Sequence, residues 1–148
     1  MLMRLSFELL IALLICCGFP SITVVAAPPS ATVAATSAPE AEEEVVIKIH
    51  ARQFRPDPVT LHAGRKTRLI FYNQDVELHA FVPVGLFEGL HLNIAGNGAP
   101  EFSAQGFKRV IIPSEGSAEF RFLPERPGVY PYFCDMPGHE MKGTLIVQ

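Results

Sequence analysis

The sequence predicts an all-β domain over residues 45–148, an antiparallel Greek-key sandwich or barrel of seven or eight strands. Three observations support this fold class. Short segments with apolar residues at alternate positions recur along this part of the chain. Turn-forming Pro, Gly, Asn and Asp residues separate them at intervals of about ten residues. No segment has the 3.6-residue apolar period of an amphipathic helix.

The expected strands alternate with recognisable turns. Two prolines in residues 54–58 break the chain between the first two strands, and Asn73 begins the turn after the third. Pro83 ends the fourth strand, and Pro-Gly corners separate the later ones. The predicted strands are residues 45–50, 59–62, 66–72, 79–82, 109–112, 117–123, 129–134 and 143–147.

Residues 84–108 differ from the rest of the domain. This stretch contains five Gly residues and Pro100, and it has no sustained strand or helix period. We therefore expect an irregular segment with one helical turn near residues 86–91. Long loops of this kind in a compact domain are often functional.

The N-terminal part of the chain has a targeting composition. Arg4 and the free amine precede a long apolar run, and small-residue cleavage sites follow it, so residues 1–27 are predicted to be a signal peptide or membrane anchor. Residues 28–44 are rich in Ala, Pro, Ser, Thr and Glu and are expected to form a disordered tether. We expect a periplasmic or other extracytoplasmic location for the 45–148 domain, with tethering where the leader is retained.

Charge excludes some partners. The 45–148 domain has 11 Lys and Arg residues against 10 Asp and Glu residues, so it is nearly neutral. It has no basic stripe for nucleic acid and no strong field of one sign. Cys16 and Cys17 lie in the leader, which leaves Cys134 as the only cysteine of the domain and leaves the domain without a disulfide.

Metal-binding side chains are concentrated near the C-terminus. Residues 130–143 read YPYFCDMPGHEMKG, which places the Cys134 thiol, the His139 imidazole and the Met141 thioether within eight residues. An unpaired cysteine in an exported protein calls for an explanation, and metal binding supplies one. Two His and one Cys with a weak axial Met form the blue-copper arrangement. His79 offers the second imidazole, so the residues predict a site for one copper ion.

Two features leave the ligand set open. Only Glu140 separates His139 from Met141, so Met136 or the Glu140 carboxylate is an alternative axial ligand. A carboxylate there would favour a tetragonal site over a blue one. His91, in the irregular segment, is the remaining alternative ligand.

A family resemblance adds to this reading. VTLHAG at residues 59–64, Asn73 ahead of His79, GVYPYFC at 128–134 and PGH ahead of MKG together resemble the cupredoxins, the blue copper proteins of the plastocyanin and azurin type. The resemblance spans residues 45–148. It implies that His79, Cys134 and His139 are equatorial copper ligands and that Met141 is the axial ligand.

Three positions depart from the family pattern. The spacing between His139 and Met141 is shorter than in most relatives. Asp135 follows Cys134 where azurin and plastocyanin relatives usually carry Ser or Thr. Ala80 follows His79 where some relatives have Asn, so we expect a hydrogen bond beside the site to be missing.

The predicted function is transport of single electrons through this copper site by an exported monomer. Its expected partners are redox proteins that dock transiently, and a membrane is involved only through an N-terminal anchor. The alternative is a periplasmic copper chaperone or sequestering module that passes copper to accepting proteins. We do not expect an enzyme, because copper oxidases and reductases of this fold need additional histidine pairs. We expect His139 to lie nearest the surface, with apolar residues such as Met136 and Pro137 around its exposed edge.

Overall fold

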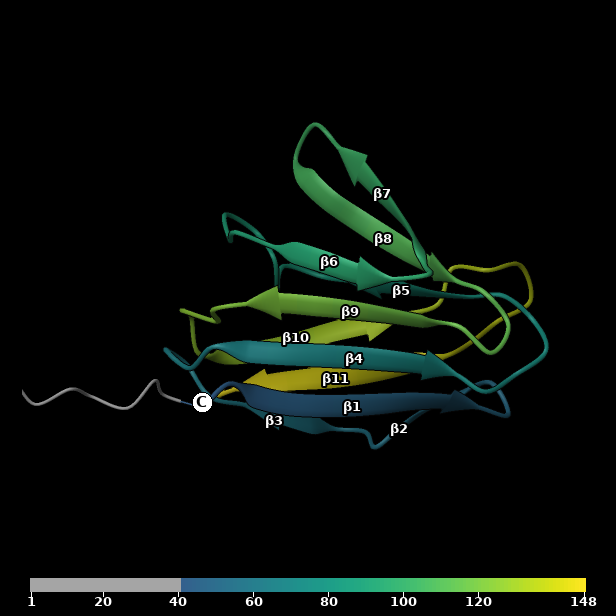
Figure 1. Ribbon diagram of the computed structural model, residues 1–148, viewed down its shortest axis with the longest axis horizontal. Helices are drawn as coiled ribbons and strands as arrows, with labels where there is room; N and C mark the ends of the chain where they lie inside the picture. Colours follow the sequence, from purple (N-terminus) through teal and green to yellow (C-terminus); the bar gives the residue numbers. More distant parts are fainter. Residues whose placement is uncertain (1–40) are drawn as a thin grey trace, which may run out of the picture. The chain divides into compact units, whose positions relative to one another are not determined.

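A computed structural model of the chain describes residues 41–148. The predicted leader lies outside the described residues, as does most of the predicted tether. The all-β sandwich is confirmed, but the predicted strand number was too low (Figure 1). Among residues 41–148, no helix has the length and apolar character of a membrane span. Residues 41–148 form eleven strands, which are β1 (Glu43–His50), β2 (Gln53–Arg55), β3 (Val59–Leu61), β4 (Thr67–Asn73), β5 (His79–Pro83), β6 (Asn93–Gly96), β7 (Ala99–Ser103), β8 (Gly106–Ile112), β9 (Ser117–Phe122), β10 (Gly128–Phe133) and β11 (Lys142–Val147).

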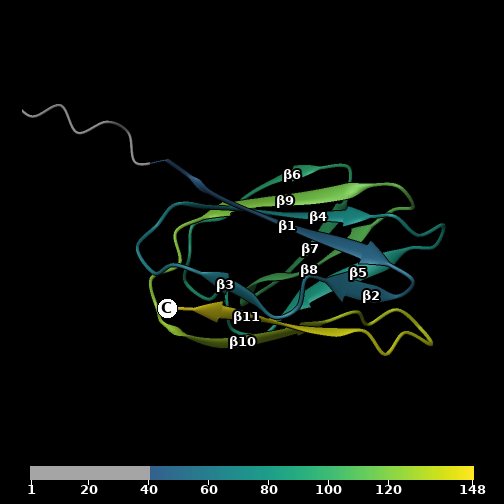
Figure 2. The ribbon, with the colours of Figure 1, turned by 90° about the horizontal axis from the view of Figure 1, so that it is seen from below.

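The strands form two sheets that pack face to face. One sheet has the order β2-β1-β4-β9-β6, and the other has the order β3-β11-β10-β5-β8-β7. Figure 2 shows β1, β4, β9 and β6 in one layer, with β3, β11 and β10 in the layer opposite. Most neighbouring strands are antiparallel, as predicted, but β1 pairs with β4 and β3 with β11 in parallel.

Aromatic side chains fill the space between the sheets. Phe71 on β4 packs against Phe81 on β5 with ring centroids 4.2 Å apart, and Phe81 contacts Tyr132 on β10 at 5.3 Å. Phe54 on β2 meets Tyr132 edge-on at 4.9 Å. These rings are nearly or fully buried, and each removes a large apolar surface from water. They join strands of both sheets into one core.

The segment 84–108 was wrongly predicted to be irregular. It contains β6, β7 and the start of β8, and residues 86–89 form turns in place of the expected helical turn. A side chain at Gly96 would approach the Ser117 carbonyl oxygen to 2.5 Å, and one at Gly98 would meet Val110 at 2.8 Å. These glycines therefore allow close packing between strands, although in sequence they resemble a loop signal.

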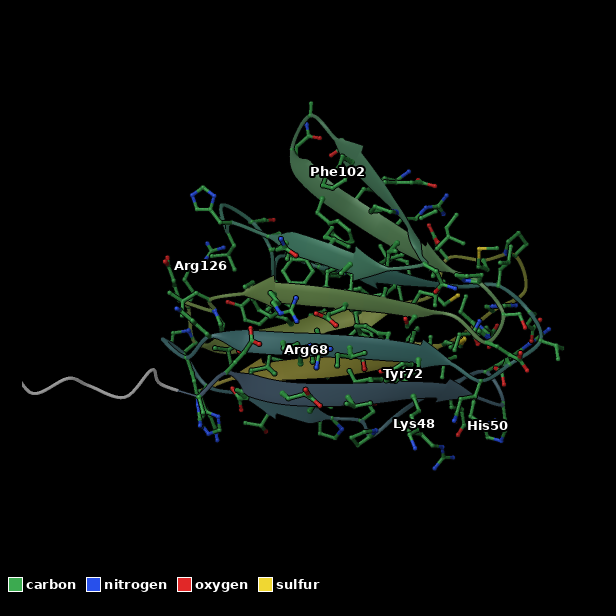
Figure 3. The ribbon with its side chains drawn as sticks, in the orientation of Figure 1. Lys48, His50, Arg68, Tyr72, Phe102 and Arg126 are labelled. Atoms are coloured by element: carbon green, nitrogen blue, oxygen red, sulfur yellow. The ribbon has the colours of Figure 1, made fainter. Side chains whose placement is uncertain are left out.

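A row of ion pairs crosses the outer face of the five-stranded sheet. The Arg68 guanidinium on β4 lies 2.5 Å from Glu44 on β1 and 2.6 Å from Glu119 on β9. Arg121 on β9 contacts Glu119 at 2.7 Å. Figure 3 labels Arg68 midway along this face. Oppositely charged neighbours on adjacent strands stabilise their pairing.

Four loops meet at one end of the sandwich. They are the β1–β2, β4–β5, β8–β9 and β10–β11 connections, which both ribbon views place together (Figures 1 and 2). His50, at the end of β1, is labelled at this end in Figure 3. β1 begins and β11 ends at the opposite end (Figure 1). The predicted ligands lie in or next to these four loops.

Candidate metal centre

Three of the predicted ligands come together at this loop end. His79 begins β5, Cys134 directly follows β10, and His139 lies in the β10–β11 loop. One donor atom from each lies within 4.8 Å of the other two, and these residues form a group that can hold a metal ion. Cys134 Sγ is 3.4 Å from His139 Nδ1, and the two imidazole centroids are 4.9 Å apart. Donor atoms that share one ion must lie this close together, because metal–ligand bonds are short. Zinc, for example, binds imidazole and thiolate at about 2.0–2.3 Å.

The strand pleat directs two of these side chains inward. Alternate residues of a strand point to the same face, so His79 shares its face with Phe81, and Cys134 shares its face with Tyr132. Phe81 and Tyr132 are in contact in the core. The packing of these two rings therefore positions the imidazole and the thiol relative to each other.

His79 has one buried ring nitrogen without a hydrogen-bond partner among the described residues. Its side chain has no exposed surface, and Nε2 lies 2.9 Å from Oδ2 of Asp75. Since a carboxylate only accepts, Nε2 carries the proton and donates it. Burial lowers the pKa of His79 and outweighs the opposing effect of Asp75, so the ring is neutral at pH 7. Nδ1 is buried without a hydrogen-bond partner among the described residues and offers its lone pair to a metal.

Cys134 is buried, and two backbone groups fix its position. The Ala80 amide donates to Sγ at 3.2 Å, and the Cys134 amide donates to the Met141 carbonyl at 3.1 Å. The bond from Ala80 to the thiol comes from its backbone N–H, which does not depend on the side chain at this position. Cys134 is a free cysteine in the described part of the chain.

Met141 lies opposite Cys134 at the base of the β10–β11 loop. The register of the two strands pairs Phe133 with Lys142, so Cys134 and Met141 form the next cross-strand position. Residues directly opposite each other point to the same face, with Cβ atoms about 5 Å apart. Met141 is buried, and it lines a surface hollow together with Cys134 and His139.

The alternative axial ligands, Glu140 and Met136, lie in the β10–β11 loop with His139. Glu140 is exposed, and its carboxylate does not belong to the metal-capable group formed by His79, Cys134 and His139. Met136 is half-buried against the hydrophobic core, and its carbonyl oxygen accepts the His139 amide at 3.0 Å.

Asp135 has a specific partner in the structure. Its carboxylate accepts a hydrogen bond from Arg109 on β8 at 2.7 Å, while the same guanidinium binds Glu101 on β7 at 2.8–2.9 Å. The residue after Cys134 therefore connects the ligand loop to the β7–β8 hairpin.

His139 is more exposed than His79, but Glu77 lies against its Nε2 edge. Its side chain is 6% exposed, and Nε2 lies 3.3 Å from Oε2 of Glu77. The predicted apolar surround is therefore interrupted by a carboxylate. Arg52 binds that carboxylate through two nitrogens at 2.6 and 2.7 Å and thereby lowers the pKa of Glu77.

Sequence reasoning missed the residues that support the two imidazoles. Burial alone would raise the pKa of Asp75, but backbone amides from Arg52 and Ala51 and the bond to His79 outweigh it and lower the pKa. The only sequence signal was the spacing of four residues between Asp75 and His79. Arg52 is more than twenty residues from both carboxylates, so no local pattern identifies it.

The remaining histidines lie outside the predicted centre. His50 Nδ1 is 3.7 Å from Asp75, and His62 pairs with Glu43 at 2.7 Å. The metal-capable groups found among residues 41–148 include none of His50, His62 and His91. His91 is thus not brought to the centre as an alternative ligand.

The cupredoxin-like domain family matches residues 21–147, and the chain belongs to this family. No curated protein sequence matches the chain.

Solved structures match most of this chain in fold, but their sequence identity to it is low. Auracyanin B is 24% identical over 74% of this chain and 90% of its own, with a TM-score of 0.54. Auracyanin A, a blue copper protein from Chloroflexus aurantiacus, is 18% identical over 73% of this chain and 100% of its own, with a TM-score of 0.53. The multicopper oxidase McoA from Aquifex aeolicus is 12% identical, covering 72% of this chain and 29% of its own, with a TM-score of 0.55. At these identities the likenesses show the fold.

Proposed function

We propose that this chain binds one copper ion through His79, Cys134 and His139, with Met141 as a weak fourth donor, and carries single electrons. The observation that carries the proposal is the buried Nδ1 of His79, which has no hydrogen-bond partner among residues 41–148, on a residue grouped with a buried thiol and a second imidazole. Soft sulfur donors with two imidazoles suit a type 1 blue copper site. Copper held there would accept and release one electron by cycling between Cu(II) and Cu(I).

Rigid support favours a carrier over a chaperone. His79 and Cys134 lie at the ends of neighbouring strands joined by Phe81 and Tyr132, and Ala80 bonds directly to the thiol sulfur. Such ligands move little when the charge of the ion changes, which suits electron transfer. A chaperone needs ligands that release the metal, and a centre enclosed by core packing does not favour release.

An extracytoplasmic location is consistent with this arrangement. We propose that the chain is exported by its N-terminal leader and works in the periplasm or on the outer face of a membrane. β1 begins at the end of the sandwich opposite the four loops (Figure 1). A tether joined to β1 would leave the end that carries His139 free to dock with redox proteins. We propose that the chain acts as a monomer.

We propose a carrier without an enzymatic role. The metal donors all come from the protein, whereas catalytic metal sites keep an open position for substrate. The spare histidines do not join the proposed ligand group.

Copper titration of the purified full-length chain tests this proposal. We expect one ion per chain, an intense blue colour, a type 1 EPR spectrum and reversible reduction. Cys134→Ala should abolish the colour, whereas His62→Ala, which changes a half-exposed histidine paired with Glu43, should retain it.

The same experiment separates the alternatives. A colourless complex formed only with Cu(I), with the metal passed readily to chelators, would support the chaperone. A wild-type chain that binds no copper, or a Cys134→Ala variant with unchanged colour and stoichiometry, would contradict the proposal.

A further inference from the structure

The turn between β1 and β2 has an unusual backbone for its residues. Ala51 and Arg52 form a two-residue hairpin loop, and both have positive φ, 51° and 55°. Type I′ turns require this conformation and strongly favour Asn-Gly. Ala51 and Arg52 both carry a Cβ, so their backbone is strained at positive φ. Such strain is often retained at functional sites.

The backbone of this turn holds the carboxylate that orients His79. The Ala51 amide donates to Asp75 Oδ1 at 2.8 Å, and the Arg52 amide donates to Oδ2 at 3.0 Å. That same Oδ2 receives the His79 Nε2 proton at 2.9 Å. The two residues with positive φ are thus the same two whose backbone amides bind the Asp75 carboxylate.

The Arg52 side chain holds the carboxylate that faces His139. Its guanidinium binds both oxygens of Glu77, and Oε2 of Glu77 lies 3.3 Å from His139 Nε2. A bidentate pair of this kind fixes the plane of the carboxylate as well as its position. Single oxygens of Asp75 and Glu77 and a nitrogen of His79 also lie within 4.8 Å of one another.

We propose that Arg52 is a positioning residue for both imidazoles of the metal centre, an inference that rests on the proposed function. Its backbone acts through Asp75 on His79, and its guanidinium acts through Glu77 on His139. Asp75 accepts the Nε2 proton of His79, and the Glu77 carboxylate lies 3.3 Å from His139 Nε2, so each carboxylate favours a proton on Nε2 and leaves the opposite Nδ1 lone pair for the metal. Hydrogen bonds from metal-binding histidines to carboxylates are known to fix tautomer and ring orientation.

An ordinary surface ion pair is the competing explanation. Exposed pairs contribute little to stability, and Arg52 and Glu77 are 53% and 36% exposed. A plain pair does not account for the contact between Glu77 and His139, or for a turn that favours other residues. The two explanations differ in what happens to the His139 proton when the guanidinium is removed.

A double variant, Ala51→Asn with Arg52→Gly, separates these roles. It provides the residues that the turn favours and keeps both backbone amides on Asp75, but it removes the guanidinium. The readout is the imidazole ¹⁵N–¹H spectrum of the metal-free full-length protein. In the wild type, we expect His79 and His139 to be Nε2–H tautomers with slowly exchanging protons.

The variant should change one histidine and spare the other. We expect the His139 Nε2 proton to exchange with solvent at least about ten times faster and its tautomer population to shift, while the His79 signals stay as in the wild type. Glu77→Ala should give the same His139 change without touching the turn. Arg55→Gln, which removes a nearby arginine that contacts Gln53, is the matched control and should change neither histidine.

Unchanged His139 signals in both the double variant and Glu77→Ala would overturn the proposal, as would Nδ1–H tautomers in the wild type. Because no metal is needed, a failure to bind copper would contradict the proposed function and leave this result standing.

Discussion

Cys134 and Met141 face each other across the base of the β10–β11 loop, joined by a hydrogen bond of 3.1 Å from the Cys134 amide to the Met141 carbonyl. This pairing places the thioether on the same face as the thiol despite the short spacing from His139. The loop can therefore be short, because Met141 directly precedes β11 and this strand sets its orientation.

This relationship predicts how Met141 tunes the copper potential. Met141→Leu removes a weak electron donor, which destabilises Cu(II) more than Cu(I), so the reduction potential should rise. We expect a rise of about 60 mV or more, which corresponds to a tenfold change for one electron. Cyclic voltammetry measures it, and copper should still bind. Met136→Leu is the matched control, and an equal shift in that variant would contradict the assignment of Met141.

Two tyrosines on β10 should respond differently to the same substitution. The Tyr130 hydroxyl donates to the Arg126 carbonyl at 2.7 Å, whereas the buried Tyr132 hydroxyl has no partner among the described residues. Tyr130→Phe should lower the free energy of unfolding by about 1 kcal/mol. Tyr132→Phe should be nearly neutral or stabilising, since it removes a buried polar group that makes no bond. Urea denaturation of both metal-free variants measures the difference, and equal losses would contradict it.

Asn73 should be required for the loop that carries Asp75 and Glu77. This side chain is 2% exposed, and its Nδ2 lies 2.8 Å from the Glu77 carbonyl and 2.9 Å from the Pro113 carbonyl. Asn73→Ala leaves these acceptors without their donor and should cost about 1–3 kcal/mol. The exposed neighbour Gln74, changed to Ala, serves as the control. A loss no larger than that of the control would show that this bridge contributes little.

Acid should weaken the ion pairs on the five-stranded sheet. Hydrogen bonding to Arg68 lowers the pKa of Glu119 below its ordinary value of 4.5, although burial opposes this. The stabilising contribution is therefore complete above about pH 4.5 and is lost as the pH falls through the lower pKa of the folded state. Denaturation of the metal-free protein from pH 6 to pH 3 should show a flatter acid limb for Glu119→Gln. Glu125→Gln, at an exposed residue, should keep the wild-type slope.

The sandwich could be predicted from the sequence where one face of each strand is buried. β4 and β9 alternate clearly because Leu69, Phe71 and Phe120 point into the core. β6 and β7 could not be recognised, since they are mostly exposed edge strands with weak alternation. Gly96 at the end of β6 and Gly98 between the two strands allow close backbone packing, but in sequence the same residues indicate a loop.

Part of the candidate centre could be predicted from a local sequence pattern. Cys134, His139 and Met141 lie within eight residues, and the chemistry of their side chains is specific, so a local pattern indicated these three residues. His79 lies far from them in the sequence and was added because a blue-copper arrangement needs a second imidazole. The support provided by Arg52 depends on a hairpin turn and two carboxylates meeting across more than twenty residues of sequence. Only the folded arrangement of β1, β2 and the β4–β5 loop brings them together.

Copper K-edge X-ray absorption of the copper-loaded full-length chain measures the ligands of the bound ion. We expect a first coordination shell of two imidazole nitrogens and one short thiolate sulfur, with the sulfur lost in Cys134→Ala. A shell made only of oxygen and nitrogen in the wild-type protein would contradict this expectation.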